Sequence, residues 1–171
     1  MVTTLTTTHV PLVFQRLETP DACHSTWELL RMMFPHLKEA QYHHYLEQAF
    51  RHQGDYWQLA VYVTYPEREG AVTPPSELLG VLGIKQEYHL YSGKTWYVEH
   101  FMIHPNARSM GIGGQMMRWV EVEAQKEEVE TLSLDTLVEN TPSQKFYYNH
   151  GYDIRGFHFL KRLNAHGSNA S

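Results

Sequence analysis

A glycine-rich stretch near the middle of the chain has the residue types that bind an anion. Residues 108–114 read RSMGIGG, follow the apolar run of residues 96–103, and precede apolar residues at helical spacing. Unpaired backbone N–H groups at a helix N-terminus attract anions, helped by about half a positive charge from the macrodipole. Gly111, Gly113 and Gly114 let a phosphate approach these groups, and Arg108 adds a cation. The stretch therefore predicts a phosphate-binding turn between a strand and a helix.

One strand also contains candidate residues for moving a proton. Glu99 lies in a mostly apolar run, where strand alternation places it opposite to Val98 and His100. A carboxylate there needs a partner, water or a raised pKa, and a raised pKa would suit a base that deprotonates an amine. An orienting or structural role for Glu99 stays open, and His100 is a second candidate base.

Two ordered motifs in this chain resemble those of the GNAT superfamily of acyl-CoA-dependent N-acyltransferases. The family's phosphate loop, Arg/Gln-x-x-Gly-x-Gly/Ala, is matched by Arg108, Gly111 and Gly113. Its second pattern, Asn-x-x-Ala-x-x-Phe-Tyr followed by Gly and an aromatic, is matched by Asn140, Ser143, Phe146, Tyr147, Gly151 and Tyr152, with serine in place of alanine. The resemblance is strong in the C-terminal half of the chain, which contains both motifs. In the N-terminal half only the order of the expected helices and strands is similar. Residues 34–37, 134–135 and 157–159 look like those of a GNAT subgroup whose acceptors are not identified.

The resemblance implies a fold, a reaction and a set of site residues. The fold would be α/β (α+β), a mixed and largely antiparallel sheet with helices on both faces. The reaction would be direct transfer of an acetyl group from acetyl-CoA to an amine. Tyr147 would be the general acid, since a phenol stays protonated at neutral pH and can donate to a thiolate, with core packing as its alternative. Glu99, which the resemblance does not place, stays a candidate base or orienting carboxylate from its position in the strand. The cofactor would be bound by Phe101, Met102, Ile103, Arg108, Ser109, Met110, Gly111, Ile112, Gly113, Gly114, Asn140, Ser143 and Phe146. Of these, Phe101 to Ile103 would act through their main chain, and Asn140 is alternatively a turn former.

The elements that must position these residues follow from hydrophobic periodicity and turn residues. The N-terminal half predicts a strand at 10–16, a helix at 19–34, and a second helix whose apolar face is Tyr42, Tyr45, Leu46, Ala49 and Phe50, ending at Gly54. A buried strand at 56–65, a loop at 66–76, a strand at 78–87 and a turn at 92–93 then lead into the strand of residues 96–103.

The C-terminal half predicts a helix after the glycine stretch, with the apolar stripe Ile112, Met116, Val120 and Ala124. A short strand at 131–136, a helix from Thr141 to Gly151 and a strand at 152–163 complete the sheet. Residues 1–163 are expected to form a single domain, and residues 164–171 a disordered tail.

Composition limits the partners of the protein. The 171 residues carry a formal charge of −5 without a long basic run, which argues against nucleic acid or an anionic membrane. No apolar run reaches the roughly 20 residues of a membrane span, and the one cysteine, Cys23, fits the cytoplasm. The 12 histidines are dispersed, and His43 and His44 diverge by about 100° on a helix, so no metal is expected. The acceptor is expected to be a small-molecule or peptide amine, Glu99 favours a cationic one, and a homodimer is left open.

Two other functions remain as alternatives. A dinucleotide-binding oxidoreductase would use Gly111 and Gly113 after one strand and Asp135 at the end of the next. However, Met116 occupies the place of the third glycine, and the loop of about seven residues before Gly111 is too long for that tight turn. A non-catalytic acyl-CoA-binding module would bind acyl-CoA tightly but release no thiol with any amine.

Overall fold

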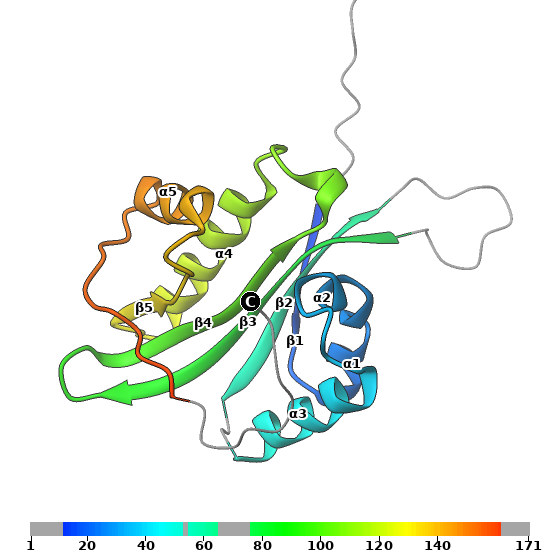
Figure 1. The fold of residues 1–171 in the computed structure, drawn as a ribbon, viewed down its shortest axis with the longest axis horizontal. Coiled ribbons are helices and arrows are strands. Elements are labelled where there is room, and N and C mark those ends of the chain that lie inside the picture. Colours follow the sequence, from blue (N-terminus) through cyan, green and yellow to red (C-terminus); the bar gives the residue numbers. More distant parts are fainter. Residues whose placement is uncertain (1–11, 53–54, 65–75, 162–171) are drawn as a thin grey trace, which may run out of the picture. The chain divides into compact units, whose positions relative to one another are not determined.

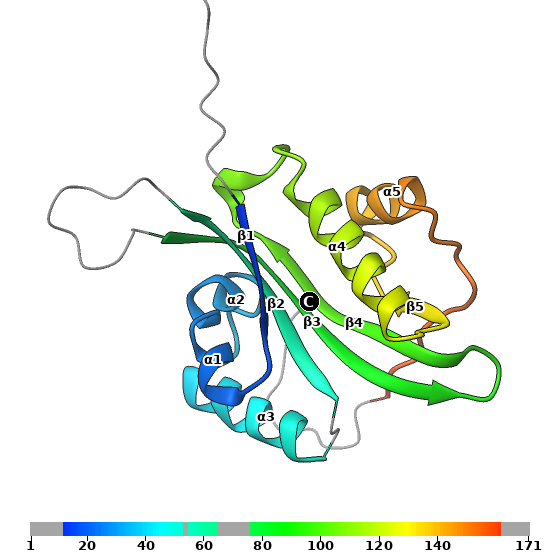
Figure 2. The same cartoon turned by 180° about the vertical axis from the view of Figure 1, so that it is seen from behind.

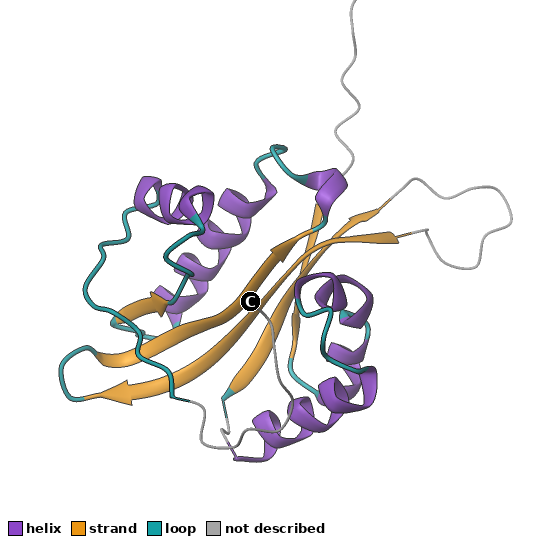
Figure 3. Cartoon of the chain, in the orientation of Figure 1, coloured by secondary structure: helices purple, strands orange, loops and turns teal. Residues whose placement is uncertain are grey.

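The computed structural model describes residues 12–52, 55–64 and 76–161 in two compact units, Met1–Leu134 and Asp135–Ser171. The first unit is a five-stranded sheet with helices on both faces (Figures 1 and 2). The second contains one helix and an irregular segment (Figure 3). The prediction of a single domain over residues 1–163 stays a prediction.

The sheet follows the order of the chain. Its strands are β1 (Leu12–Leu17), β2 (Tyr56–Thr64), β3 (Ser76–His89), β4 (Gly93–Ile103) and β5 (Thr131–Leu134). The first four pair antiparallel with their sequence neighbours, whereas β5 pairs parallel with β4 after a helical crossover. This mixed, mostly antiparallel sheet confirms the predicted fold class, and it excludes the all-parallel sheet of a Rossmann unit.

Helices α1 (Pro20–His24), α2 (Trp27–Met33) and α3 (Glu39–His52) belong to one layer. The sequence predicts a single helix over residues 19–34, which is wrong because the helix is interrupted at Ser25 and Thr26. Both hydroxyls donate to carbonyls of the preceding turn, Ser25 to Ala22 and Thr26 to Cys23, at 2.7 and 2.8 Å. These side chain to backbone bonds compete with helix continuation.

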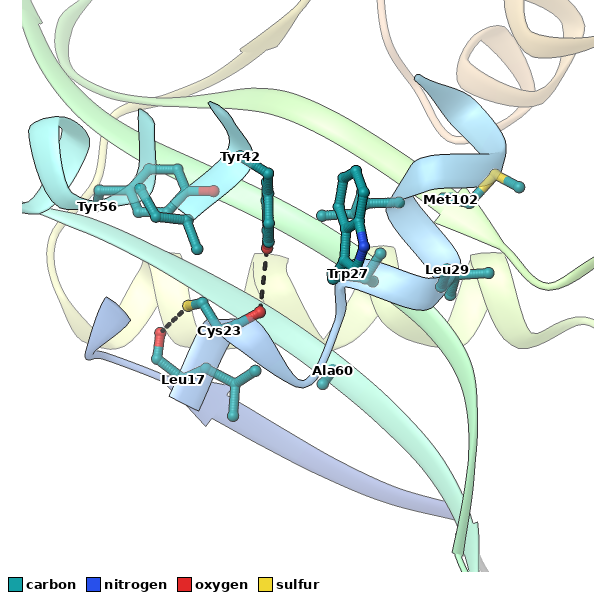
Figure 4. Close-up of a cluster of buried hydrophobic side chains, with 11 residues drawn as sticks. Leu17, Cys23, Trp27, Leu29, Tyr42, Tyr56, Ala60 and Met102 are labelled. Carbon is teal, nitrogen blue, oxygen red and sulfur yellow. Dashed lines mark hydrogen bonds between the residues drawn. The ribbon is translucent and has the colours of Figure 1, made fainter. Parts of the chain in front are cut away.

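The core between this layer and the sheet contains a cluster of buried hydrophobic side chains (Figure 4). It also contains the buried polar residues Gln58 and Thr26. Buried Gln58 donates to Tyr56 at 2.9 Å and to Tyr42 at 3.2 Å, and its Oε1 atom lies 2.7 Å from the hydroxyl of Thr26. The Tyr42 hydroxyl also donates to the carbonyl of Cys23 at 3.0 Å. A satisfied buried network of this kind fixes one arrangement of packed elements. The predicted apolar face of α3 holds for Tyr42 and Leu46, but Tyr45 is 56% exposed.

Helix α4 (Ile112–Lys126) covers the other face of the sheet. A Cβ atom added to Gly80 would lie 2.7 Å from Sδ of Met116, so β3 passes very close to α4 at that point. The next residue, Val81, packs in the cluster with α1, α2 and α3. Successive strand residues face opposite ways, which places the two helical layers on opposite faces. The predicted stripe of Ile112, Met116, Val120 and Ala124 is buried, as expected.

The second unit contains α5 (Thr141–Asn149), with Asn140 as its N-cap. Residues 152–161 are irregular and mostly exposed, so the predicted strand at 152–163 is wrong for the described residues. The segment is rich in residues that favour strands, but composition alone does not provide a pairing partner. The expected loop at 66–76, apart from Ser76, and the expected tail at 164–171 lie outside the described residues.

Candidate active site

The glycine loop, residues 108–114, joins β4 to α4 through the short 3-10 helix η1 (Pro105–Ala107). Gly111 is the N-cap of α4, with φ 75° and ψ 6°, and Ser109 also has a positive φ of 64°. This left-handed conformation favours glycine because a Cβ atom would strain the backbone. Arg108, Ser109 and Met110 are exposed, as the anion-binding prediction requires.

The N-terminus of α4 has no side-chain cap among the described residues. No acidic residue lies in its first turn. An added Cβ at Gly111 would meet no atom within 4 Å, so the space beside this turn is open. A 15-residue helix that begins in this way offers its first N–H groups and its macrodipole to an anion.

Strand β4 extends beyond its pairing with β5. The parallel register ends at the pair Val98 and Leu134, while β4 continues to Ile103. The predicted cofactor residues Phe101, Met102 and Ile103 lie in this extension. The Met102 side chain is buried against α1, α2 and α3, so the main chain is what this residue can offer a ligand.

A β-bulge interrupts β4 at Glu99. His100 pairs with Gly83, but the next pair is Val98 with Ile84, so Glu99 is an extra residue without a partner on β3. The His100 ring lies directly on Gly83, whose added Cβ would be 2.3 Å from Cε1 of the ring. A bulge bends its strand and redirects side chains. Strand alternation predicts that the side chain of Glu99 points away from those of both Val98 and His100. Because of the bulge, this prediction is wrong for His100.

Glu99 combines solvent exposure with a perturbed pKa. Its side chain is exposed by surface area, yet the surrounding protein desolvates the carboxylate and raises its pKa, as does Glu87, while Lys85 lowers it. The two observations agree for a group that is surrounded by protein on several sides but open to solvent on one. Among the described residues, no salt bridge or hydrogen bond to the Glu99 carboxylate is found. This geometry suits a carboxylate that receives an amine.

His100 does not suit the role of a base. Burial lowers its pKa to about 4, so the ring is neutral at physiological pH and holds a proton weakly. Its Nε2 atom is buried without a hydrogen-bond partner. The structure therefore favours Glu99 over His100 among the two candidates.

Next to Glu99, β3 carries alternating charged residues that sequence reasoning did not single out. The Glu87 carboxylate accepts from Nζ of Lys85 at 2.6 Å and lies 2.9 Å from Nε2 of His89. Their hydrogen bonds lower the pKa of Glu87 despite its partial desolvation. We call Lys85, Glu87, His89 and Glu99 the charged strip. The period-two spacing in β3 is a signal that could have revealed it, but only the register with β4 brings Glu99 into it.

The remaining predicted residues lie in the second unit. Asn140 caps α5, its Oδ1 accepting from the backbone N–H of Ser143 at 3.3 Å. Phe146 and Tyr147 have ring centroids 5.3 Å apart. Burial raises the pKa of the Tyr147 phenol to about 12, so it stays protonated throughout the physiological range. Asn140, Ser143, Phe146 and Tyr147 thus share one unit, and the glycine loop and Glu99 share the other.

Other reactive groups in the described part of the chain do not form a second centre. The Cys23 thiol is buried near the carbonyl of Leu17, and burial raises its pKa to about 12. Within residues 12–52, 55–64 and 76–161, no cluster of three or more metal-ligating side chains is found. Nor does any helix in those ranges have the length and apolar character needed to cross a bilayer.

Comparison with known proteins finds relatives of this fold and these motifs. The profile of the acetyltransferase (GNAT) family matches residues 23–152. An aminoalkylphosphonate N-acetyltransferase of Salmonella typhimurium is 28% identical over 89 residues, which are 51% of this chain and 57% of that relative. The match therefore spans little more than half of the relative's length.

Solved structures agree in fold. The aminoglycoside N-acetyltransferase AAC(6')-Iy, crystallised with CoA, superposes with a TM-score of 0.70 at 16% identity, covering 93% of this chain and 100% of that one. A ribosomal-protein-alanine N-acetyltransferase from Brucella melitensis biovar Abortus superposes with a TM-score of 0.66 at 15% identity, covering 90% and 100%. At these identities the likeness establishes the fold alone.

Proposed function

The chain belongs to the acetyltransferase (GNAT) family, as its two motifs indicate, and from this membership we propose that it transfers an acetyl group from acetyl-CoA directly to an amine. The observation that carries the proposal is the exposed, left-handed glycine loop at the start of α4. It directly follows a strand whose final residues lie beyond the β4–β5 ladder.

The cofactor would be held mainly by backbone. We assign the pyrophosphate to the main-chain N–H groups of the glycine loop, with Arg108 as an added cation. The pantetheine arm and the thioester carbonyl would lie along the β4 main chain at residues 101–103. Asn140, Ser143 and Phe146 are proposed as further pantetheine-binding residues, as the family motif implies.

The transfer needs no covalent enzyme intermediate. The amine nitrogen attacks the thioester carbonyl carbon, the C–S bond of the tetrahedral intermediate breaks, and the acetyl group stays on nitrogen. Tyr147 would donate its phenolic proton to the departing thiolate and regain one from solvent. The proton lost by the amine would pass to Glu99 or to a water that Glu99 orients. The high pKa of Tyr147 keeps its proton in place until the thiolate forms.

The acceptor is proposed to be a small-molecule or peptide amine. The related proteins named above act, by their names, on aminoalkylphosphonates, aminoglycosides or a protein, which share only the amine. The exposed carboxylate of Glu99 would attract the protonated form of such an amine. We further propose a cytoplasmic location, and a homodimer is left open.

The test is release of free CoA thiol from acetyl-CoA across small amines, aminoglycosides, polyamines and peptide N-termini. Thiol release that requires an amine, with the acetylated amine identified by mass, supports the proposal. If the protein binds acetyl-CoA tightly but no amine releases thiol, it is a binding module instead. Competing titrations with NADH and acetyl-CoA test the oxidoreductase alternative, which requires binding of NADH.

A further inference from the structure

The charged strip occupies the sheet face that carries α1, α2 and α3. Val81 of β3 packs in the core with residues of these helices. From Val81 to His89 the pairing of β3 with β2 and β4 shows no extra residue on β3, so Lys85, Glu87 and His89 share the face of Val81. Glu99 belongs to the same neighbourhood, since its charge interacts with those of Lys85 and Glu87.

The charges in this strip are unequally satisfied. Glu87 has two partners, Lys85 at 2.6 Å and His89 at 2.9 Å, and is therefore compensated. Glu99 has neither an ion pair nor a hydrogen bond to its carboxylate among the described residues. Glu99 is thus the carboxylate of the strip that is available to an incoming ammonium group.

Lys85 has donors to spare. A lysine ammonium has three N–H donors, and within the described residues one acceptor is found for them, the Glu87 carboxylate. The side chain is 29% exposed, so solvent or a ligand can reach it. An accessible cation therefore lies beside an accessible carboxylate to which it is not bonded.

This arrangement complements a molecule with both charges. An acceptor with an ammonium group at one end and an oxyanion at the other could meet Glu99 and Lys85 together. An acceptor with a second ammonium group would instead place that group against Lys85, and like charges repel in partly desolvated surroundings. Glu87 would not offset this repulsion, because its charge is already compensated by Lys85 and His89.

We propose that the acceptor is a small amine that also carries an anionic group, and that Lys85 is the residue that selects it. The inference rests on the proposed acetyl transfer and names the substrate class of that site. It narrows the expectation of a cationic acceptor, because the ammonium end meets a carboxylate while the other end meets a cation.

The test compares amines of one chain length and different second groups. The set is 3-aminopropylphosphonate and 4-aminobutanoate as anionic members, 3-amino-1-propanol as the neutral member and 1,3-diaminopropane as the dicationic one. We expect the better anionic member to exceed the neutral amine at least about tenfold in kcat/KM, since one hydrogen bond between charged groups is of that size. The two anionic members separate a phosphonate from a carboxylate preference.

Variants of Lys85 test whether this residue selects the anionic acceptor. Lys85→Gln should reduce the ratio of anionic to neutral acceptor to near one, and Lys85→Arg should keep most of it. Lys126→Gln, which removes a lysine paired with Glu123 on α4, is the control and should leave the ratio unchanged. Circular dichroism of each variant checks the fold.

The outcomes separate the two proposals. A preference of the wild type for the neutral or dicationic amine, or an unchanged ratio in a folded Lys85→Gln variant, overturns this inference and leaves acetyl transfer standing. Absence of thiol release with every amine class, despite binding of acetyl-CoA, overturns the transfer function and this inference with it.

Discussion

The glycine loop and the charged strip are built from different parts of the chain. The loop presents main-chain N–H groups, and its side chains matter chiefly by their absence at Gly111 and Gly113. The charged strip presents side chains from two strands, and its composition depends on how β3 and β4 are paired. A main-chain site suits a cofactor that every family member shares, whereas a side-chain site can differ from one acceptor to another. The predictions below test this division of roles, in order of decreasing effect on activity.

The largest effect is expected at Tyr147, which belongs to neither region. Tyr147→Phe keeps the ring that packs against Phe146 and removes only the proton donor. Turnover should fall by roughly 10² to 10⁴ because the thiolate loses its general acid. Affinity for acetyl-CoA, measured by calorimetry, should change little. Near-full turnover at saturating substrates would mean that the thiolate takes its proton from elsewhere.

Glu99 should affect the acceptor step and not the cofactor. Glu99→Gln keeps the shape and removes the charge, so kcat/KM should fall by about 10² at neutral pH, the lower end for acid–base catalysis. Because burial and Glu87 raise the pKa of Glu99, the wild type should gain activity as pH rises through that raised pKa. The variant should recover partly at high pH, where free amine is abundant.

The pH profile with an accepted amine is the measurement for Glu99. Equal loss at all pH values would indicate a structural role for this carboxylate. If the variant loses no activity, Glu99 is not part of the site. The contrast between the glycine loop and the charged strip would then no longer hold.

The glycine loop should affect the cofactor and not the acceptor. A bulky residue at Gly111 or Gly113 should weaken acetyl-CoA binding at least about tenfold, or about 1.4 kcal/mol, by blocking phosphate from the amides. Gly111 variants also carry backbone strain because φ is 75°, whereas Gly113 has no positive φ, so Gly113→Val isolates the blocking effect. Unchanged affinity in both folded variants would refute the pyrophosphate assignment.

The smallest direct effect on activity is expected at Gly83, where a substitution should act first on the stability of the fold. Gly83→Ala would push against the buried His100 ring and should cost about 1–3 kcal/mol, as overpacking of a core does. Gly156→Ala is the matched control, since its added Cβ would meet no atom within 4 Å. Urea denaturation measures both variants. A Gly83→Ala protein as stable as the wild type would show that the ring does not secure the bulge.

Local signals in the sequence predicted much of the fold and the turn at the glycine loop. The unbroken apolar run of β2, the stripe of α4 and the proline-initiated α5 are each determined by neighbours along the chain. The glycine loop was predictable for the same reason, because its function depends on the conformation that a few consecutive residues adopt. The two sequence motifs of the chain also indicated the family, and the profile match over residues 23–152 confirms that assignment.

What the sequence did not predict depends on contacts between distant residues. The break between α1 and α2 involves Thr26, whose hydroxyl meets Gln58 on β2. Residues 152–161 are rich in residues that favour strands, but a strand exists only where another strand supplies its hydrogen bonds.

The charged strip shows most clearly what the tertiary structure alone decided. Lys85, Glu87 and Glu99 are ordinary charged residues in two separate strands. The period-two spacing places Lys85 and Glu87 on one face of β3, but nothing in the sequence indicates that Glu99 lies near them. The bulge at Glu99, opposite Gly83 and the His100 ring, changes the register by one residue and thereby changes which side chains share a face. The sequence by itself thus determined the fold class and the glycine loop, because backbone conformation is local. Only the folded sheet decided which charged side chains lie together, because pairing between strands is not local.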